Sequence, residues 1–321
     1  MNKVVTSGEL LRECRSQLTQ AGFESARHEA ALLISHHSGY SIAKIYSYPE
    51  LPLDAAQNLA IRQDLQRRLN HEPLAYILGN WEFYGLVFDV GPGVLIPRPE
   101  TERLVETARD QAVQHFSGRL WAGQADETLP LRVLDTCTGS GCVGIATAFA
   151  LQAAGFAVDL TVLETDPLAA AFARRNLDRH GLGDFPPGQP VQSASTPPVQ
   201  ARLVLADLWP APGSVFDVIT ANPPYIVQSV LQELMPDVRD HEPHLALDGG
   251  VDGLNFYRRL IQESPAYLAQ TGLLLLEHGY DQADALARLL AINGFDDLVL
   301  VHDYAGHPRV SGGWRSGLPD T

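Results

Sequence analysis

Lysine, cysteine and long apolar runs are scarce in this chain of 321 residues. Lys3 and Lys44 are the only lysines, and no run of basic residues is available to displace the counterions of a nucleic-acid backbone. No stretch of about 18 uncharged apolar residues could span a bilayer, and the opening MNKVVTSGEL lacks the apolar core of a signal peptide. We therefore expect a cytoplasmic protein that binds neither nucleic acid nor a membrane directly.

The cysteines and histidines form no pattern typical of a metal site or a disulfide framework. Cys14, Cys137 and Cys142 are too few and too unevenly spaced for either, so we expect three small buried thiols. The spacing of the 11 histidines likewise indicates no metal-binding set. We expect no metal cofactor.

The net charge of −15 is unevenly distributed along the chain. Residues 1–78 carry eight basic and eight acidic side chains, so residues 79–321 hold the whole acidic excess. An acidic surface favours a basic partner surface, because complementary charge steers association. The composition therefore favours a protein or a small molecule as substrate.

The first 78 residues have the pattern of a small helical bundle. Thr6 with Glu9, and Asp54 with Gln57, have the spacing of a capping box, in which side chains satisfy free backbone N–H groups at a helix start. A further apolar stripe of helical period lies between these two starts, and each stripe must be buried against another helix. We predict that residues 1–78 form an N-terminal helical domain. If the substrate is a protein, we expect this domain to recognise the substrate.

The apolar period changes to two between Trp81 and Ile96, which indicates β-strands. Tyr84-Gly85 provides a turn between two short runs of this kind. We interpret residues 79–97 as a β-hairpin linker.

Strand and helix patterns alternate through residues 98–321, which we interpret as a second domain. The predicted strands are 132–134, 159–163, 201–206, 216–221, 273–277 and 297–301, and predicted helices begin near 142, 167 and 281. Such alternation predicts an α/β fold with a doubly wound, Rossmann-like and mostly parallel sheet. Residues 181–200 are rich in Pro, Gln and Ser and are interpreted as a mobile surface insertion.

Three acidic residues stand where successive predicted strands end. Asp135 opens the segment DTCTGSGC, whose Gly139 allows a tight turn and a close approach of backbone N–H groups to a ligand. Glu164 could accept hydrogen bonds from both ribose hydroxyls of a nucleoside. Asp207 could accept from an adenine amine, with Leu208 packed beside the ring. No Lys follows the glycines, so the loop differs from a phosphate loop, and we interpret it as different also from the dinucleotide fingerprint G-x-G-x-x-G. The three acids would frame a nucleoside that needs no phosphate grip, which favours S-adenosylmethionine over NAD.

The predicted strand 216–221 ends in Asn222-Pro223-Pro224-Tyr225. Proline ends such a strand because it has no N–H to give to the sheet, so the segment fits a strand stop followed by a turn. Its position beside the three candidate ligand-binding strand ends also fits a reactive loop.

Several motifs together resemble one protein family. They are PLAYILGNWEFYGLVFDV at 73–90, VLIPRPETERLVE at 94–106, the loop at 135–142, NPPYI at 222–226, HEPHLALDGGVDGLNFYRRL at 241–260, LLLLEHGYDQ at 273–282 and AGHPRV at 305–310. With them the chain resembles class I S-adenosylmethionine-dependent methyltransferases, and among these the HemK/PrmC family. That family methylates the N5 of a glutamine in bacterial peptide chain release factors. NPPY alone is shared with adenine-N6 methyltransferases, whereas IPRPETE together with HEP is far more specific.

The resemblance implies a site for the glutamine of the Gly-Gly-Gln loop of a release factor. Asn222 and the carbonyl of Pro223 would accept hydrogen bonds from the two N–H groups of the target amide, and Tyr225 would cover its flat face. The implied catalytic residues are Asn222, Pro223, Pro224 and Tyr225, and the substrate-binding set adds Arg98, Glu100 and Glu242. The residues expected to bind S-adenosylmethionine are Asp135, Cys137, Thr138, Gly139, Ser140, Gly141, Glu164, Asp207, Leu208 and Asn222. We expect a monomer.

Three other functions stay open. Cys137 stands where release-factor enzymes usually have Gly, and CTGSGC resembles a sister family that methylates a glutamine of a large-subunit ribosomal protein. Adenine-N6 methylation of nucleic acid shares NPPY, but the acidic charge argues against it. A protein that senses the cofactor or acts as a scaffold without turnover is the third, and the joint presence of the strand-end acids and NPPY argues against it.

Overall fold

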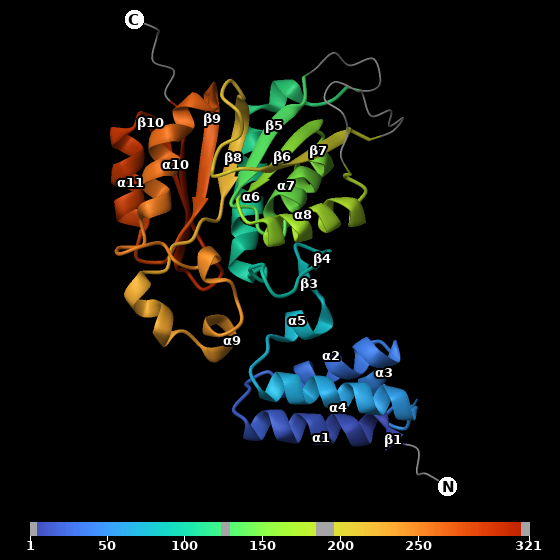
Figure 1. The fold of residues 1–321 in the computed structure, drawn as a ribbon. Helices are drawn as coiled ribbons and strands as arrows, with labels where there is room; N and C mark the ends of the chain where they lie inside the picture. The colour runs from blue at the N-terminus through green and yellow to red at the C-terminus, as the bar shows by residue number, and fades with distance from the viewer. Residues whose placement is uncertain (1–4, 123–128, 184–195, 316–321) are drawn as a thin grey trace, which may run out of the picture. The chain divides into compact units, whose positions relative to one another are not determined.

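The computed structural model describes residues 5–122, 129–183 and 196–315. The chain divides into two compact units (Figure 1). Unit 1 is the chain up to Asn80 together with Met235–His241, and unit 2 is Trp81–Leu234 together with the chain from Glu242 onward. Most of the insertion expected at 181–200 lies outside the described residues.

Unit 1 is built mainly from helices. They are α1 (Ser7–Gln20), α2 (Ala26–Ser38), α3 (Ile42–Ser47), α4 (Ala55–Leu69), α5 (Leu74–Leu78) and α9 (Pro236–Arg239), and the two-residue strands β1 (Val5–Thr6) and β2 (Pro52–Leu53) pair beside them. Both expected capping boxes are present, at Thr6 with Glu9 and at Asp54 with Gln57. The short α3 and the β1–β2 pair were not predicted.

A buried ion-pair cluster holds the segment Met235–His241 within unit 1. Arg68 is only 6% exposed, and its guanidinium donates to Glu29 (Nε to Oε2, 2.6 Å) and to Asp237 (Nη1 to Oδ2, 2.6 Å). His71 also pairs with Asp237, at 3.0 Å. The sequence gives no local sign of this contact, because Arg68 and Asp237 lie 169 positions apart.

The expected hairpin is present in the chain after α5. Strands β3 (Asn80–Phe83) and β4 (Leu86–Asp89) pair with each other. Tyr84 and Gly85 form the turn, and both have positive φ angles, 54° and 73°. The chain then continues through the 3₁₀ turn η1 (Pro99–Thr101) into α6 (Glu102–His115).

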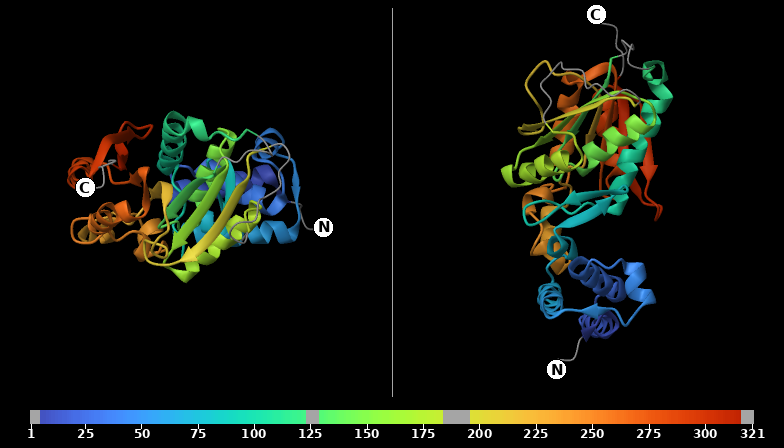
Figure 2. Two further views of the ribbon diagram at one scale, coloured as in Figure 1. Left: turned by 90° about the horizontal axis from the view of Figure 1, so that it is seen from above. Right: turned by 90° about the vertical axis from the view of Figure 1, so that its right-hand side faces the viewer.

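A seven-stranded sheet forms the centre of unit 2, in the order β10-β11-β9-β8-β5-β6-β7 (Figures 1 and 2). The strands are β5 (Leu131–Thr136), β6 (Val158–Glu164), β7 (Val199–Leu205), β8 (Phe216–Ala221), β9 (Leu268–Glu277), β10 (Phe295–His302) and β11 (Pro308–Arg315). Strands β5 to β9 pair in parallel, and β11 is antiparallel to both β9 and β10. The prediction of a doubly wound α/β fold is confirmed, but the last strand, β11, was not predicted.

Helices cover both faces of this sheet. The helices are α7 (Cys142–Ala153), α8 (Pro167–Arg179), α10 (Asn255–Glu263) and α11 (Ala283–Ile292), besides α6, and the short 3₁₀ turns are η2 (Ser117–Arg119), η3 (Gln228–Glu233), η4 (His244–Ala246) and η5 (Ser264–Ala266). Neighbouring residues of a strand point to opposite faces, so Val218 packs in the core shared with α6 and α7, and Ile219 packs in the core shared with α10 and α11. Within the described ranges, no helix is both long and apolar enough to cross a membrane.

The order of the strands defines where such a sheet binds ligands. From β5 the chain moves outward through β6 to β7, and it then returns to the other side of β5 with β8. Open α/β sheets bind ligands in the crevice that this reversal creates, outside the carboxyl ends of the strands. The loops after β5, β6, β7 and β8 therefore meet at one edge.

Candidate active site

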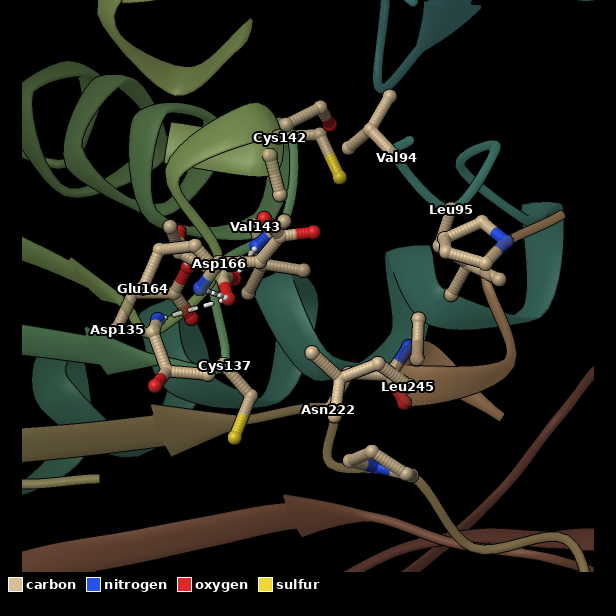
Figure 3. Close-up of a pocket in the computed structure, with 18 of the residues that line it drawn as sticks. Val94, Leu95, Asp135, Cys137, Cys142, Val143, Glu164, Asp166, Asn222 and Leu245 are labelled. Atoms are coloured by element: carbon tan, nitrogen blue, oxygen red, sulfur yellow. Dashed lines mark hydrogen bonds between the residues drawn. The ribbon is translucent and has the colours of Figure 1, made fainter. Parts of the chain in front are cut away.

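A cavity opens at this edge of the sheet and encloses about 950 Å³, including the space at its mouth. That is about the upper end of the 300–1,000 Å³ usual for small-molecule sites. Figure 3 shows Asp135 and Glu164 on the left side of the view and Asn222 and Leu245 on the right. The lining includes Val94, Leu95, Ile96, Arg98, Thr101, Asp135, Cys137, Thr138, Gly139, Ser140, Cys142, Glu164, Asp166, Asp207, Leu208, Asn222, Pro224, Leu245 and Phe256.

Asp135 organises the loop between β5 and α7 from the inside. It is 1% exposed, and its Oδ2 accepts from the Gly144 N–H at 3.0 Å and from the Thr138 hydroxyl. Its Oδ1 accepts from the hydroxyl of Thr220 on β8 at 2.8 Å. Burial raises the pKa of Asp135 to about 6, although these hydrogen bonds lower it. Both carboxyl oxygens thus already accept hydrogen bonds from groups of the protein.

The glycines at 139, 141 and 144 have the spacing G-x-G-x-x-G, so the interpretation of this loop as different from that fingerprint is wrong. Gly139 and Gly141 have positive φ angles of 56° and 82°, which glycine adopts without strain. A Cβ on Gly144 would lie 2.8 Å from a methyl group of Val162, so only glycine lets α7 approach β6 this closely.

Cys137 is partly exposed in the cavity, so the expectation of three buried thiols holds for Cys14 and Cys142 but is wrong for Cys137. Its φ of 56° lies in the left-handed region, where a Cβ costs energy. Leu208, also in the cavity wall, has a φ of 60°. Two strained residues therefore line the same cavity.

Glu164, at the end of β6, connects the loop after β5 to the loop after β6 at the base of the cavity. One carboxylate oxygen accepts from the Gly139 N–H at 2.9 Å, and the other accepts from the N–H groups of Thr165 (2.8 Å) and Asp166 (3.0 Å), as the dashed lines of Figure 3 indicate in part. The carboxylate is 8% exposed and borders the cavity. It remains within reach of a ligand through the lone pairs that these bonds leave.

The third strand-end acid, Asp207, lies in a more open setting. Its side chain is 60% exposed and pairs with Arg259 at 3.0 Å. The neighbouring Leu208 is buried and forms part of the apolar core as well as the cavity wall. Asp207 can therefore exchange its partner Arg259 for a ligand with little structural change.

The segment Asn222-Pro223-Pro224-Tyr225 follows β8 directly and enters the site. Asn222 and Pro224 line the cavity, Pro223 is buried and Tyr225 is half-buried. The Asn222 Nδ2 donates to the Thr101 hydroxyl at 3.3 Å, so the Asn222 carboxamide oxygen is the end available to accept from a ligand. Burial raises the pKa of the Tyr225 phenol, so this group stays protonated at neutral pH.

The backbone after Tyr225 is held in place on two sides. The Tyr225 carbonyl accepts from Gln282 Nε2 at 3.1 Å, and Ile226 forms a β-bridge with Asp248. A Cβ on Gly249 would lie 2.7 Å from the Tyr225 Cα, so this approach requires glycine. The loop is therefore fixed by its neighbours as well as by its prolines.

Arg98 and Glu242 form an ion pair in the wall of the site. Glu242 is 3% exposed, and its carboxylate accepts from Arg98 Nη2 and, at 3.2 Å, from the Ile96 N–H. Arg98 lines the cavity, whereas Glu242 and Glu100 are absent from its lining. Glu242 thus lies behind Arg98.

Several residues of the site were missed by the sequence interpretation. Asp166 caps α8 by accepting from the Leu168 N–H at 2.9 Å, and the sequence TDP before a helix could have revealed it. Phe256 and Leu245 carry no local signal, since they reach the cavity only through the fold. Glu277, fully buried at the end of β9, was quoted within a motif but given no role.

Comparison with known proteins shows similarity along the chain. Residues 9–79 match the family model described as PrmC N-terminal domain. The release factor glutamine methyltransferase of Geobacter sulfurreducens is 36% identical over 314 residues, covering 97% of each chain, and that of Burkholderia pseudomallei is 37% identical, covering 90% of this chain and 92% of the relative. The solved protein-(glutamine-N5) methyltransferase (release factor-specific) of Alicyclobacillus acidocaldarius is 28% identical, with a TM-score of 0.36 over 71% of this chain and 99% of that one. With relatives above 30% identity over nearly its whole length, the chain belongs to the HemK/PrmC family of release factor glutamine methyltransferases.

Proposed function

We propose that this protein transfers a methyl group from S-adenosylmethionine to the side-chain amide nitrogen of the glutamine in the Gly-Gly-Gln loop of a peptide chain release factor. The observation that carries the proposal is the position of Asn222. Its carboxamide borders the same cavity as Glu164, and its oxygen is the end available to accept from a substrate.

The residues around the cavity fit S-adenosylmethionine. Glu164 can accept from ribose hydroxyls, and Asp207 can accept from the adenine amine. Leu208 and Phe256 provide apolar surface for the ring. The left-handed conformation of Cys137 and Leu208 brings backbone close to the ligand position, which is where strained residues concentrate in proteins. These groups would bind the ribose and the adenine of a nucleoside, and none of them has to bind a phosphate group.

S-adenosylmethionine supplies, when bound, a methyl group on a positively charged sulfur. The glutamine nitrogen forms the new bond to the methyl carbon as the carbon–sulfur bond breaks, and the nitrogen then loses one proton to solvent. An amide nitrogen is a poor nucleophile, because its lone pair is delocalised into the carbonyl. The oxygen of Asn222 and the carbonyl of Pro223 would accept from its two N–H groups, which raises electron density on nitrogen and fixes its direction.

The remaining residues of the segment assist this positioning. Pro223 and Pro224 have no N–H groups to give to a sheet, so the chain leaves β8 and its carbonyls stay available to the substrate. Tyr225 stays protonated and would cover the flat face of the amide, which excludes water. Arg98, held by Glu242, would border the entrance for the glutamine loop.

We further propose that unit 1 binds the body of the release factor and that the acidic surface of unit 2 faces a basic surface of it. Charge complementarity of this kind steers association and weakens with salt. Direct binding of nucleic acid is not part of the proposal, because the chain has no run of cations.

The test is transfer of radiolabelled methyl from S-adenosylmethionine to purified release factor. The parallel substrates are the same factor with the loop glutamine replaced by Ala, a large-subunit ribosomal protein and duplex DNA. We expect label only on the intact factor, and a loss of at least about 100-fold in Asn222→Ala. Asn293→Ala, at the end of α11 and outside the cavity lining, serves as the matched control.

Each other outcome points to a different function. Label on the ribosomal protein would assign the chain to the reaction that Cys137 suggested, and label on DNA would revive adenine methylation. No label on any substrate, with S-adenosylmethionine still bound, would favour a sensor without turnover.

A further inference from the structure

We propose that Glu277 is a positioning residue that, together with Thr101, fixes the orientation of the Asn222 carboxamide so that its oxygen faces the substrate. This inference deepens the proposed function, since it assumes that Asn222 receives the glutamine amide.

The sheet brings Glu277 beside Asn222. Strands β8 and β9 run in parallel with Ala221 opposite Leu276, so the next residues along each chain segment, Asn222 and Glu277, lie at the same level. On its other side Glu277 lies opposite Val310 of β11. Strand β9 lies between β8 and β11, α6 packs against β8 and β9, and Glu277 is 0% exposed.

Glu277 has an unusual hydrogen-bond environment. Within the described part of the chain, neither carboxylate oxygen has a hydrogen-bond partner of regular geometry. A buried carboxylate in that state is costly and usually marks a functional site. Its main-chain carbonyl, by contrast, accepts from the Tyr257 hydroxyl at 2.8 Å, so the backbone at this position is firmly held.

Thr101 connects the carboxyl group to Asn222. The Thr101 hydroxyl accepts from Asn222 Nδ2 at 3.3 Å, so its own proton is left to donate to another acceptor. Thr101 borders the cavity, but only 2% of its surface is exposed, so it has little access to water as an acceptor. We infer that the carboxylate of Glu277 is this acceptor. Asn222 then donates to Thr101, and Thr101 donates to Glu277.

The direction of this chain decides which end of Asn222 faces the cavity. An ionised carboxylate only accepts, so Thr101 donates to it and accepts from the Asn222 nitrogen. A protonated carboxyl group can donate instead, and Thr101 could then donate to the oxygen of Asn222. That arrangement would turn the carboxamide and present its NH₂ group to a substrate that also offers N–H groups.

The protonation of Glu277 can change in the neutral range. Burial raises its pKa to about 7, while the nearby donors Thr101 and Asn222 and the charge of Arg309 lower it and the charge of Glu100 raises it. The other ionisable groups that face it are Tyr225, Tyr257 and Cys142, from the loop after β8, from α10 and from α7. Burial raises the pKa of each of these three, so they stay neutral while Glu277 titrates.

The kinetic test compares Glu277→Gln, which cannot ionise, with Thr101→Val, which keeps the side-chain shape but lacks the hydroxyl. Both should lower kcat at about pH 8.5 by about 10-fold to 100-fold, because the amide acceptor is misplaced rather than removed. The KM for release factor and the Kd for S-adenosylhomocysteine should change by less than about 3-fold. Thr101→Ser should recover about 10-fold of the rate lost in Thr101→Val, because one hydrogen bond of the chain is restored.

The control and the pH profile separate positioning from simple stability. Thr107→Val removes a buried hydroxyl within α6, which donates to the Arg103 carbonyl, and should leave the rate unchanged. The wild-type kcat/KM should fall about 10-fold for each pH unit below about 7, and that fall should be absent in Glu277→Gln. Wild-type rates and an unchanged pH profile in Glu277→Gln and Thr101→Val would overturn the proposal.

A measurement without turnover keeps this inference separate from the proposed function. The side-chain NH₂ signals of Asn222 in the nuclear magnetic resonance spectrum, identified by their loss in Asn222→Ala, should shift with pH around a midpoint of about 7 in the wild type and not in Glu277→Gln. If the shift is seen but release factor is not methylated, the proposed function fails and the positioning stands. If the signals do not respond to pH or to Glu277, the positioning is refuted whatever the substrate.

Discussion

Replacing Asp135 by Asn tests whether the cofactor loop depends on a buried, ionisable carboxyl group. The two side chains have the same shape. An Asn oxygen can accept from the Gly144 N–H and the Thr138 hydroxyl, and its NH₂ group can donate to the Thr220 hydroxyl, which is free to rotate. The substitution therefore removes the ionisation and conserves most of the hydrogen bonds.

The magnitude follows from the pKa of Asp135. Burial raises it from 3.8 to about 6, so between these values the folded protein keeps a proton that the unfolded chain has already lost. The contribution of Asp135 to stability must then fall as pH rises through this window and stay constant above it. Asn does not titrate, so the free energy of unfolding of Asp135→Asn minus that of the wild type should increase by about 2.4 kcal/mol from about pH 4 to about pH 7.

Urea unfolding followed by tryptophan fluorescence gives the required difference. All four tryptophans follow Asn80 in the chain, so the signal reports on unit 2. Other titrating groups, Glu277 among them, are present in both proteins and cancel in the difference. Asp207→Asn makes the same chemical change at an exposed position and is the control. A difference for Asp135→Asn that stays constant within about 0.5 kcal/mol from about pH 4 to about pH 7 would refute the reasoning, since that is near the error of the extrapolation.

Two further substitutions test the packing of each unit. Gly144→Ala would place a Cβ within 2.9 Å of two neighbouring side chains, so unit 2 should lose about 1–3 kcal/mol in urea unfolding, whereas Gly118→Ala, where no atom lies within 4 Å, should not be destabilised. Arg68→Met removes a buried cation from two partly buried carboxylates, so amide hydrogen exchange at residues 235–241 should accelerate at least about 10-fold, the loss expected from breaking such a pair. Arg62→Met, which breaks a more exposed pair with Glu13, should leave that exchange unchanged, and equal effects of the two would contradict the role of Arg68.

The elements that could be predicted from sequence are those whose signal is local. The strand Phe216–Ala221 was predicted with its observed ends, because an apolar run stops at two prolines. The capping boxes of α1 and α4 were predicted from pairs of residues three positions apart. In each case a few adjacent residues determine the backbone conformation, so tertiary contacts had little to override.

The elements that were missed depend on distant contacts. Strand β11 contains Gly312 and Gly313, which break the apolar pattern, and Gly312 pairs with both β9 and β10, where an added Cβ would lie 2.1 Å from the Leu274 carbonyl. The burial of this strand on both sides is therefore a property of the sheet. The attachment of residues 235–241 to unit 1 likewise depends on ion pairs between residues far apart in sequence.

The sequence predicts the positions of the three strand-end acids but not their environments. In the sequence, each of the three is an acidic residue at the end of a predicted strand, and we assigned all three to cofactor binding: Asp135, Glu164 and Asp207. All three line the cavity, but their environments differ: both oxygens of Asp135 accept hydrogen bonds within the protein, Glu164 accepts from three N–H groups, and Asp207 is exposed beside Arg259. The difference arises from which way each carboxylate turns, and that is decided by partners on other strands.

Glu277 is a fourth strand-end acid whose environment only the fold reveals. It too is an acid at the end of a parallel strand, next to β8, which Asn222 follows directly. Its sequence context, a run of leucines followed by Glu, predicts only a buried strand. The charge becomes informative because the sheet buries it without a regular hydrogen bond and places Thr101 between it and the candidate acceptor of the substrate amide. A group that binds neither cofactor nor substrate can thus determine which end of Asn222 the substrate meets.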